Sequence, residues 1–331
     1  MDYILEASAV VARSCQTKDF STFRLVIKFM DTLTKQLADP QTLARISRLE
    51  LRARAVVEGV ISGMHKSPHR GSSVEFAQHR DYVPGDEIRH IDWKVYARSD
   101  RYQIKQYEEE TNLKATLVVD TSTSMDYKGT TSHLSKREYA AIVGAAIASL
   151  LMRQRDTVGL TTFDDGVRQF IPPGSTSAHM KLLLEMLEKR DTNPKTSVGD
   201  TFHDLAERLK RRGMIIVLSD LFTDPDEMLR GLQHFRHRKH EVIIFHVLDR
   251  DEVSFPFKDA SVFQGMEGEP PLMAEPNALR REYLQIFGEY VERLKKGCRE
   301  LNMDYQQLIT DLPVDAALAR YLASRTGMSR K

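Results

Sequence analysis

Short runs of consecutive apolar residues recur through the last two thirds of the chain, with helix-like segments between them. The clearest runs cover residues 115–119, 157–163, 214–218 and 242–247. A continuously apolar run of this length is typical of a central strand in a parallel sheet, which is buried on both faces. Because strands and helices alternate, we predict a doubly wound, mainly parallel α/β sheet over residues 113–331.

Segments with a helical period of apolar positions lie between and after these strands. They cover residues 136–153, 178–189, 201–212, 277–301 and 314–325, and one more strand is expected at 305–309. Proline and glycine are frequent at about 252–276, and both favour turns over regular structure. We therefore expect an irregular insertion there.

Two further segments precede the predicted sheet. Residues 1–60 are rich in Leu, Ala, Arg and Glu, which are good helix formers, so we predict a helical amino-terminal segment. Residues 61–112 hold polar, turn-forming stretches and one alternating stretch at 101–110 that is typical of a strand. We expect this second segment to pack on the sheet domain.

Composition narrows the class of protein. Apolar residues make up 41% of 331 residues, too many for a disordered chain, and 48 basic against 47 acidic side chains argue against a nucleic-acid binder. No run approaches the roughly 18 apolar residues of a membrane span, and the first residues lack the basic start of a signal peptide. Cys15 and Cys298 alone make neither a disulfide framework nor a cysteine zinc site. We therefore expect a cytoplasmic protein.

Two of the apolar strands end in an aspartate, which packing alone does not require. Asp120 follows one strand and Asp220 follows another, and Ser122 and Ser124 come directly after Asp120. Ligands of open α/β sheets gather at the carboxyl ends of the strands, so these side chains should meet at one edge. Thr201, at the start of a predicted helix, offers a third hydroxyl. Such an all-oxygen set suits Mg²⁺ or another hard divalent cation.

This pattern resembles the metal-ion-dependent adhesion site of the von Willebrand factor A (VWA) fold. That motif is Asp-x-Ser-x-Ser, then a separate Thr, then a separate Asp, and it matches Asp120, Ser122, Ser124, Thr201 and Asp220 in order. Thr196 is a competing candidate for the Thr. The resemblance implies that the hydroxyls bind the metal directly or nearly so and that the aspartates act largely through water. It also implies that an acidic residue of a partner completes the metal shell.

A narrower resemblance covers roughly residues 37–331. The chain looks like the soluble branch of the bacterial family called domain of unknown function 58. The residues that carry this resemblance are Phe76, 80–82, 84–86, Arg89, 91–94, 97–98 and 310–313, with Leu318, Tyr321, Leu322 and Arg325 near the end. The resemblance implies a MoxR-type AAA+ ATPase as partner. The expected function is a non-catalytic, metal-dependent protein-binding module acting in complex assembly or maturation.

Several alternatives remain open at this point. The Asp-x-Ser-x-Ser segment could simply form a turn and cap a helix. The charged residues around Trp93 could be an internal clamp instead of a docking surface. A strand-terminal Asp beside Mg²⁺ also begins aspartyl-phosphate phosphohydrolases, in which Asp120 would be the nucleophile. A nucleic-acid adaptor using the basic tracts 210–212 and 236–239 is the third alternative, although such tracts are typical of helix carboxyl ends.

Overall fold

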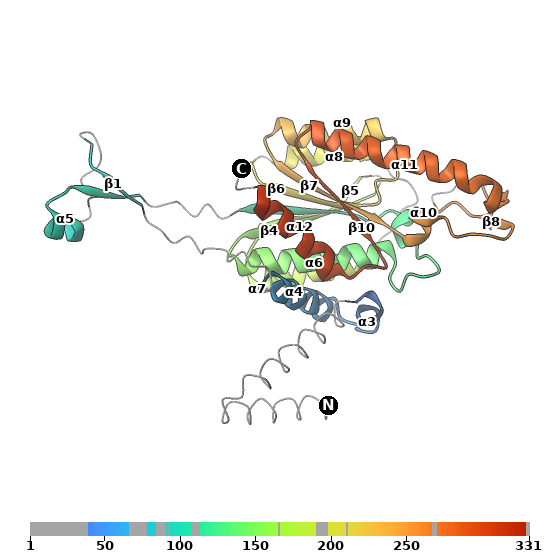
Figure 1. Ribbon diagram of the computed structural model, residues 1–331, viewed down its shortest axis with the longest axis horizontal. Helices are drawn as coiled ribbons and strands as arrows, with labels where there is room; N and C mark the ends of the chain where they lie inside the picture. The colour runs from blue at the N-terminus through green and yellow to red at the C-terminus, as the bar shows by residue number, and fades with distance from the viewer. Residues whose placement is uncertain are drawn as a thin grey trace, which may run out of the picture. The chain divides into compact units, whose positions relative to one another are not determined.

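A computed structural model describes most of the chain. It covers residues 39–65, 78–83, 91, 93–106, 113–164, 166–189, 198–209, 211–266 and 270–328. The chain divides into two compact units, one of residues 67–112 and one of the remaining residues (Figure 1). Residues 1–38 and much of the family signature, including 84–90, lie outside the described residues.

A six-stranded sheet forms the centre of the larger unit within the described residues. Its strands are β3 (Lys114–Asp120), β4 (Thr157–Phe163), β5 (Val167–Gly174), β6 (Met214–Ser219), β7 (Glu241–Leu248) and β10 (Asp304–Ile309). The order across the sheet is β10-β7-β6-β3-β4-β5, and only the edge pair β4–β5 is antiparallel. The predicted doubly wound, mainly parallel sheet is confirmed.

Helices cover both faces of this sheet (Figure 1). One apolar core is formed with α3 (Pro40–Ala44), α4 (Leu49–His65), α6 (Lys136–Arg153), α7 (Ser177–Glu188) and α12 (Val314–Met328). The core on the other face is formed with α8 (Val198–Arg208), α9 (Pro225–His237) and α11 (Pro276–Glu300). Two separate cores on one sheet explain why the strands are apolar on both faces.

Helix α6 is the central helix of the first face, and its start is well defined by the sequence. Ser135 caps it, and a reciprocal pair of hydrogen bonds between Ser135 and Glu138 forms a capping box. Its five alanines are all buried, and a Cβ added at Gly144 would lie 3.3 Å from a side-chain carbon of Leu218 in β6. Small side chains therefore let α6 lie close to the strands that carry the site.

Some predicted elements differ from the structure. Strand β5 was not predicted, because Pro172 and Pro173 argue against a central strand; it lies at the sheet edge, where proline is tolerated. The helix predicted at 201–212 is α8 and begins and ends earlier. The stretch predicted to be irregular holds the short helix α10 (Arg250–Ser254) and an antiparallel pair, β8 (Ser261–Phe263) and β9 (Leu272–Ala274).

Helix α4 belongs to the predicted amino-terminal helical segment and packs into the first core. Val56, Val57 and Val60 of α4 are fully buried in the first core. The smaller unit contains an antiparallel pair, β1 (Gln78–Asp81) with β2 (Gln103–Gln106), and helix α5 (Trp93–Ser99). Inside it, Tyr96 stacks on Tyr102 with ring centroids 4.4 Å apart. Whether this unit packs on the sheet domain stays a prediction.

Candidate metal centre

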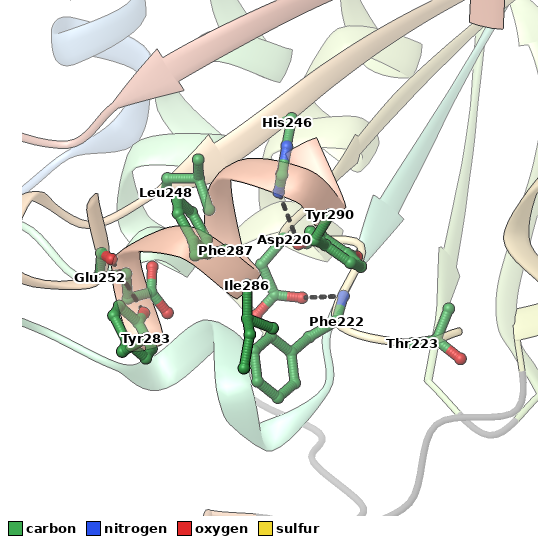
Figure 2. A pocket seen from close by; sticks show the side chains of 10 residues that line it. All are labelled: Asp220, Phe222, Thr223, His246, Leu248, Glu252, Tyr283, Ile286, Phe287 and Tyr290. Carbon is green, nitrogen blue, oxygen red and sulfur yellow. Dashed lines mark hydrogen bonds between the residues drawn. The ribbon is translucent and has the colours of Figure 1, made fainter. Parts of the chain in front are cut away.

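The two strand-terminal aspartates lie at the point where the sheet changes winding direction. In the order of the chain, the six strands follow the pattern 3-2-1-4-5-6, and ligands of such sheets bind between strands 1 and 4. These are β3 and β6, which pair directly, with Val119 opposite Leu218. Asp120 ends β3, and Asp220 is the first residue after β6 (Figure 2). The topology therefore brings both carboxylates to one crevice.

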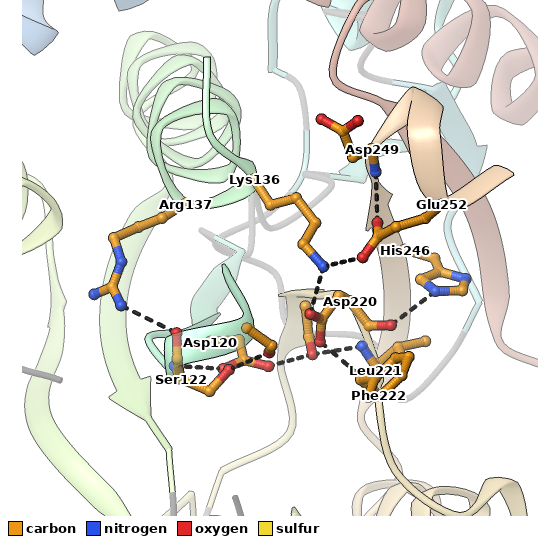
Figure 3. Close-up of polar contacts among 12 residues, drawn as sticks. Asp120, Ser122, Lys136, Arg137, Asp220, Leu221, Phe222, His246, Asp249 and Glu252 are labelled. Carbon is orange, nitrogen blue, oxygen red and sulfur yellow. Dashed lines mark hydrogen bonds and ion pairs between the residues drawn. The ribbon is translucent and has the colours of Figure 1, made fainter. Parts of the chain in front are cut away.

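Four of the candidate residues are linked by hydrogen bonds. Asp120 Oδ1 accepts the backbone N–H of Ser122 at 2.9 Å, and the Ser122 and Ser124 hydroxyl oxygens lie 3.0 Å apart. Ser124 hydrogen-bonds through its side chain to Asp220. Ser219 donates to Asp120 Oδ2 at 2.5 Å from the last position of β6. The two carboxylates and two hydroxyls therefore form one continuous oxygen cluster (Figure 3).

Arg137 of α6 holds the serine segment in place. Its Nη2 donates to the carbonyl oxygens of Thr121 and Ser122 at 2.8 and 3.1 Å, and its Nε donates to Asp126 Oδ1 at 2.7 Å. Asp126 ends the short 3₁₀ helix η2 (Thr123–Asp126), so both ends of the turn are attached to one guanidinium. A fixed backbone keeps the two serine hydroxyls directed to the same point.

Burial and charge act differently on the two aspartates. Asp120 is 1% exposed and Asp220 is 2% exposed. Burial, together with the nearby Asp220 charge, raises the pKa of Asp120 to about 7. Burial also acts to raise the pKa of Asp220, but the charge and hydrogen bond of Lys136 outweigh it, so that pKa is lowered. Asp220 is therefore ionised at neutral pH, whereas Asp120 is close to half protonated.

Lys136 is a buried cation that the sequence analysis missed. Its Nζ lies 2.8 Å from Asp220 Oδ2 and 2.6 Å from Glu252 Oε1, and the side chain is only 1% exposed. Glu252 is held in turn by the backbone N–H of Asp249, as part of the capping box of α10. One signal was present in the sequence: a lysine in the first turn of a helix opposes the helix dipole and requires another reason.

His246 of β7 fixes the backbone at Asp220. Its Nε2 donates to the Asp220 carbonyl oxygen at 2.8 Å, so Nδ1 is the acceptor for the Tyr305 hydroxyl at 2.5 Å. Burial lowers the pKa of His246 to about 4. The ring is therefore neutral and acts as a structural brace, with both nitrogens engaged.

The donor set fits a hard divalent cation. Mg²⁺ binds oxygen at about 2.0–2.1 Å in octahedral geometry, which separates adjacent ligands by about 3.0 Å. The Ser122 and Ser124 oxygens are 3.0 Å apart. Within the described residues, no cluster of three or more His, Cys, Asp or Glu side chains could hold a metal ion. A metal at this position would therefore depend on the two hydroxyls and on water as well as on the aspartates.

Thr201 lies on a different element, α8, from the other four candidate residues. It is buried on α8, next to Phe202, whose ring packs against Phe163 at 5.3 Å. Phe163 ends β4, and its carbonyl oxygen accepts hydrogen bonds from the backbone and side chain of Thr121. The neighbour of Thr201 therefore packs on the end of β4, and the place of Thr201 itself among the metal ligands stays a prediction. The competing Thr196 is outside the described residues.

Comparison with known proteins identifies the family. A family profile described as protein of unknown function DUF58 matches residues 78–289. The chain belongs to the DUF58 family. It is also 28% identical over 297 residues to an uncharacterized protein of Mycobacterium tuberculosis, Rv1480. The matched region covers 88% of this chain and 92% of that protein.

Solved structures with similarity to this DUF58 chain are distant from it in sequence. They include BatB from Bacteroides thetaiotaomicron, with 14% identity, 65% of this chain and 99% of that chain covered, and a TM-score of 0.43. The VWA domain of SpRpn10 has 11% identity, 62% and 94% coverage, and a TM-score of 0.36. The sheet order described above gives this DUF58 protein a VWA-like α/β fold. Within the described residues, no helix is long and apolar enough to cross a membrane.

Proposed function

We propose that this DUF58 protein is a non-catalytic, metal-ion-dependent protein-binding module. The observation that carries this proposal is the oxygen cluster of Asp120, Ser122, Ser124 and Asp220 at the switch point of the sheet. Thr201 completes the proposed ligand set. A divalent ion such as Mg²⁺, held mainly by neutral hydroxyls and water, keeps enough positive charge to attract a carboxylate of a partner protein.

The partner that we propose is a MoxR-type AAA+ ATPase or a client that it acts on, and this proposal rests on the DUF58 family resemblance. The ATPase would supply nucleotide hydrolysis, while this chain would supply the contact through an acidic residue. A cytoplasmic location fits such a partner, and the described cysteine, Cys298, is a buried free thiol. Assembly or maturation of a protein complex is the process in which such a pair would act.

The surroundings of Asp120 support binding over the rival phosphohydrolase mechanism. A nucleophilic aspartate must present a free, ionised oxygen to the phosphorus atom. Here the Ser122 backbone N–H and the Ser219 hydroxyl donate to the two oxygens of Asp120, and the side chain is buried. A carboxylate with both oxygens occupied by hydrogen bonds supports a role in ordering the neighbouring hydroxyls and water.

The experiment that tests this proposal uses the full chain and its serine ligands. Ser122→Ala combined with Ser124→Ala removes both hydroxyls, and Thr123→Ala, between them on the same turn, is the matched control. We expect 5 mM MgCl₂ to raise the melting temperature of the native protein and of Thr123→Ala, but not that of the double variant. If Mg²⁺, Mn²⁺ and Ca²⁺ all leave the melting temperature of the native protein unchanged, that result would contradict metal dependence.

The same three proteins test the partner. Purified MoxR-type ATPase from the same organism is mixed with each of them in MgCl₂ or in EDTA. Capture by the native protein and by Thr123→Ala, lost in EDTA and in the double variant, supports a metal-bridged contact. Equal capture by the double variant would refute it. Phosphatase turnover on a panel of phosphate esters that disappears with Asp120→Asn would instead favour the enzyme.

A further inference from the structure

A cavity of about 330 Å³ opens beside the candidate metal centre, with Asp220 at its edge (Figure 2). Its apolar walls come from two directions. Phe222 lies in the segment after β6, Leu248 is the last residue of β7, and Tyr283, Ile286, Phe287 and Tyr290 come from α11. Cavities of this size and character are typical of ligand or side-chain binding sites.

Most of the polar side chains around this cavity already have partners within the chain. The Tyr283 hydroxyl donates to the Glu252 carbonyl oxygen at 2.9 Å, and the Tyr290 hydroxyl donates to the Leu221 carbonyl oxygen. Lys136 pairs with both nearby carboxylates, those of Asp220 and Glu252. A group buried in the cavity therefore finds apolar walls and few free polar partners, which favours an apolar occupant.

A second cavity, also of about 330 Å³, continues the surface along α11. Phe255, Phe263, Leu272 and Leu279 line it, and it shares Tyr283 and Ile286 with the first. Leu279, Tyr283, Ile286 and Tyr290 repeat at helical spacing along one side of α11. At 1.5 Å per residue, this stripe is about 16 Å long, or about three helical turns. We call the two cavities and the stripe between them the α11 groove.

Two large apolar side chains of the groove are exposed to solvent. Phe222 is 71% exposed and Ile286 is 59% exposed. The turn that presents Phe222 places Leu221, which is not a glycine, at φ 53°, a sparsely populated backbone region. The Tyr290 hydroxyl donates to the Leu221 carbonyl oxygen, and His246 donates to the Asp220 carbonyl oxygen, so both side chains hold the backbone of this turn. A fixed, exposed aromatic beside a candidate metal centre is typical of an interaction site.

We propose that the α11 groove binds one amphipathic helix of a partner protein, with an acidic residue at the helix end that reaches the metal. The length of the groove matches about three turns of helix, and apolar anchors at i, i+3 or i+4 and i+7 would fill the two cavities. The proposed metal ion beside Asp220 would attract a carboxylate, so the acidic end of the partner helix should lie at the Asp220 end of the groove. The acidic contact rests on the proposed metal-dependent function, whereas the apolar contact does not.

The test is a selection of binding peptides on the purified full chain. A phage library of 16-residue peptides with randomised helix faces is selected in MgCl₂, and enriched peptides are synthesised for fluorescence anisotropy. Phe222→Ser and Ile286→Asp change the groove. Leu182→Asp is the matched control. Leu182 is an exposed apolar residue (41%) on α7, which covers the opposite face of the sheet from α11. We expect both groove variants to weaken binding at least tenfold and the control to bind as native.

The outcomes separate this inference from the proposed function. Peptides with helical apolar spacing and a terminal acid, weakened by EDTA and by both groove variants, support both proposals. Peptides whose binding is weakened by the groove variants but not by EDTA support the groove as a binding site and contradict the metal-dependent contact. Peptides that need only an acid and Mg²⁺ contradict the groove. Failure to enrich any helical consensus, or loss of self-association in the groove variants, which would indicate a second copy of this chain as occupant, overturns the inference.

Discussion

Replacing Lys136 by methionine tests the electrostatics of the crevice most severely. The ammonium pairs with Asp220 at 2.8 Å and Glu252 at 2.6 Å, and the Lys136 and Asp220 side chains are 1% and 2% exposed. Methionine keeps most of the side-chain volume but leaves these carboxylates without their cation. Removing one partner of a buried ion pair costs about 3–5 kcal/mol. Because Asp220 is fully buried and Glu252 is partly exposed, we expect a loss of about 4 kcal/mol.

The assay is urea unfolding at pH 7.5 in EDTA, with the midpoint converted to free energy through the slope. Lys136→Met combined with Glu252→Gln removes one positive and one negative charge together, so it should regain about 1–2 kcal/mol of the loss. Lys128→Met, at an exposed position, should change stability by less than about 0.5 kcal/mol. Added Mg²⁺ should stabilise Lys136→Met more than the native protein, because the ion supplies the missing charge.

A loss below about 1 kcal/mol for Lys136→Met would mean that the crevice does not need this cation, contrary to the ion pairs described above. Equal stability of the single and double variants would show that Glu252 is not coupled to Lys136. Either result would require a different charge arrangement around Asp220 from the one in the structure.

Two further predictions concern the same region. Asp120 has a folded-state pKa of about 7 against an ordinary 3.8, so its contribution favours folding below about pH 4 and is lost as pH rises to 7. In EDTA, the stability of native protein relative to Asp120→Asn should therefore fall by about 1 kcal/mol per pH unit between pH 5 and 7, and a constant difference would argue against the raised pKa. A Cβ at Gly129 would lie 2.0 Å from Asp249 Oδ1. Gly129→Ala should cost about 2 kcal/mol in urea unfolding, against little change for Gly166→Ala, where a Cβ meets nothing within 4 Å; equal effects would contradict this packing.

The strands that carry the site could be predicted because they are buried on both faces and apolar throughout. The short apolar runs at residues 115–119 and 214–218 are typical of central strands. Once these strands are placed side by side in a parallel sheet, the aspartates that follow them must lie at the same edge. Edge strand β5 could not be predicted, since its two prolines are acceptable only at a position that the whole sheet determines.

The chemistry around the site was harder to predict than its ligands. Lys136 reaches Asp220 and Glu252 across 84 and 116 residues of sequence, and no local pattern records such a pairing. Phe222 is 71% exposed and follows Leu221, whose backbone is left-handed at φ 53°. Leucine rarely adopts this conformation, so the sequence did not predict the turn. Helix ends were easier: His234, Arg236 and His237 do lie in the last turn of α9, as the basic tract indicated.

The most direct test of the central claim is anomalous X-ray diffraction from crystals of the full chain grown with Mn²⁺, which replaces Mg²⁺ at oxygen sites. We expect one strong manganese peak in the crevice at the ends of β3 and β6, within about 2.3 Å of the Ser122 and Ser124 hydroxyl oxygens. Crystals of the Ser122→Ala, Ser124→Ala variant should lack that peak. A native crystal in saturating Mn²⁺ with no peak in the crevice would contradict the account.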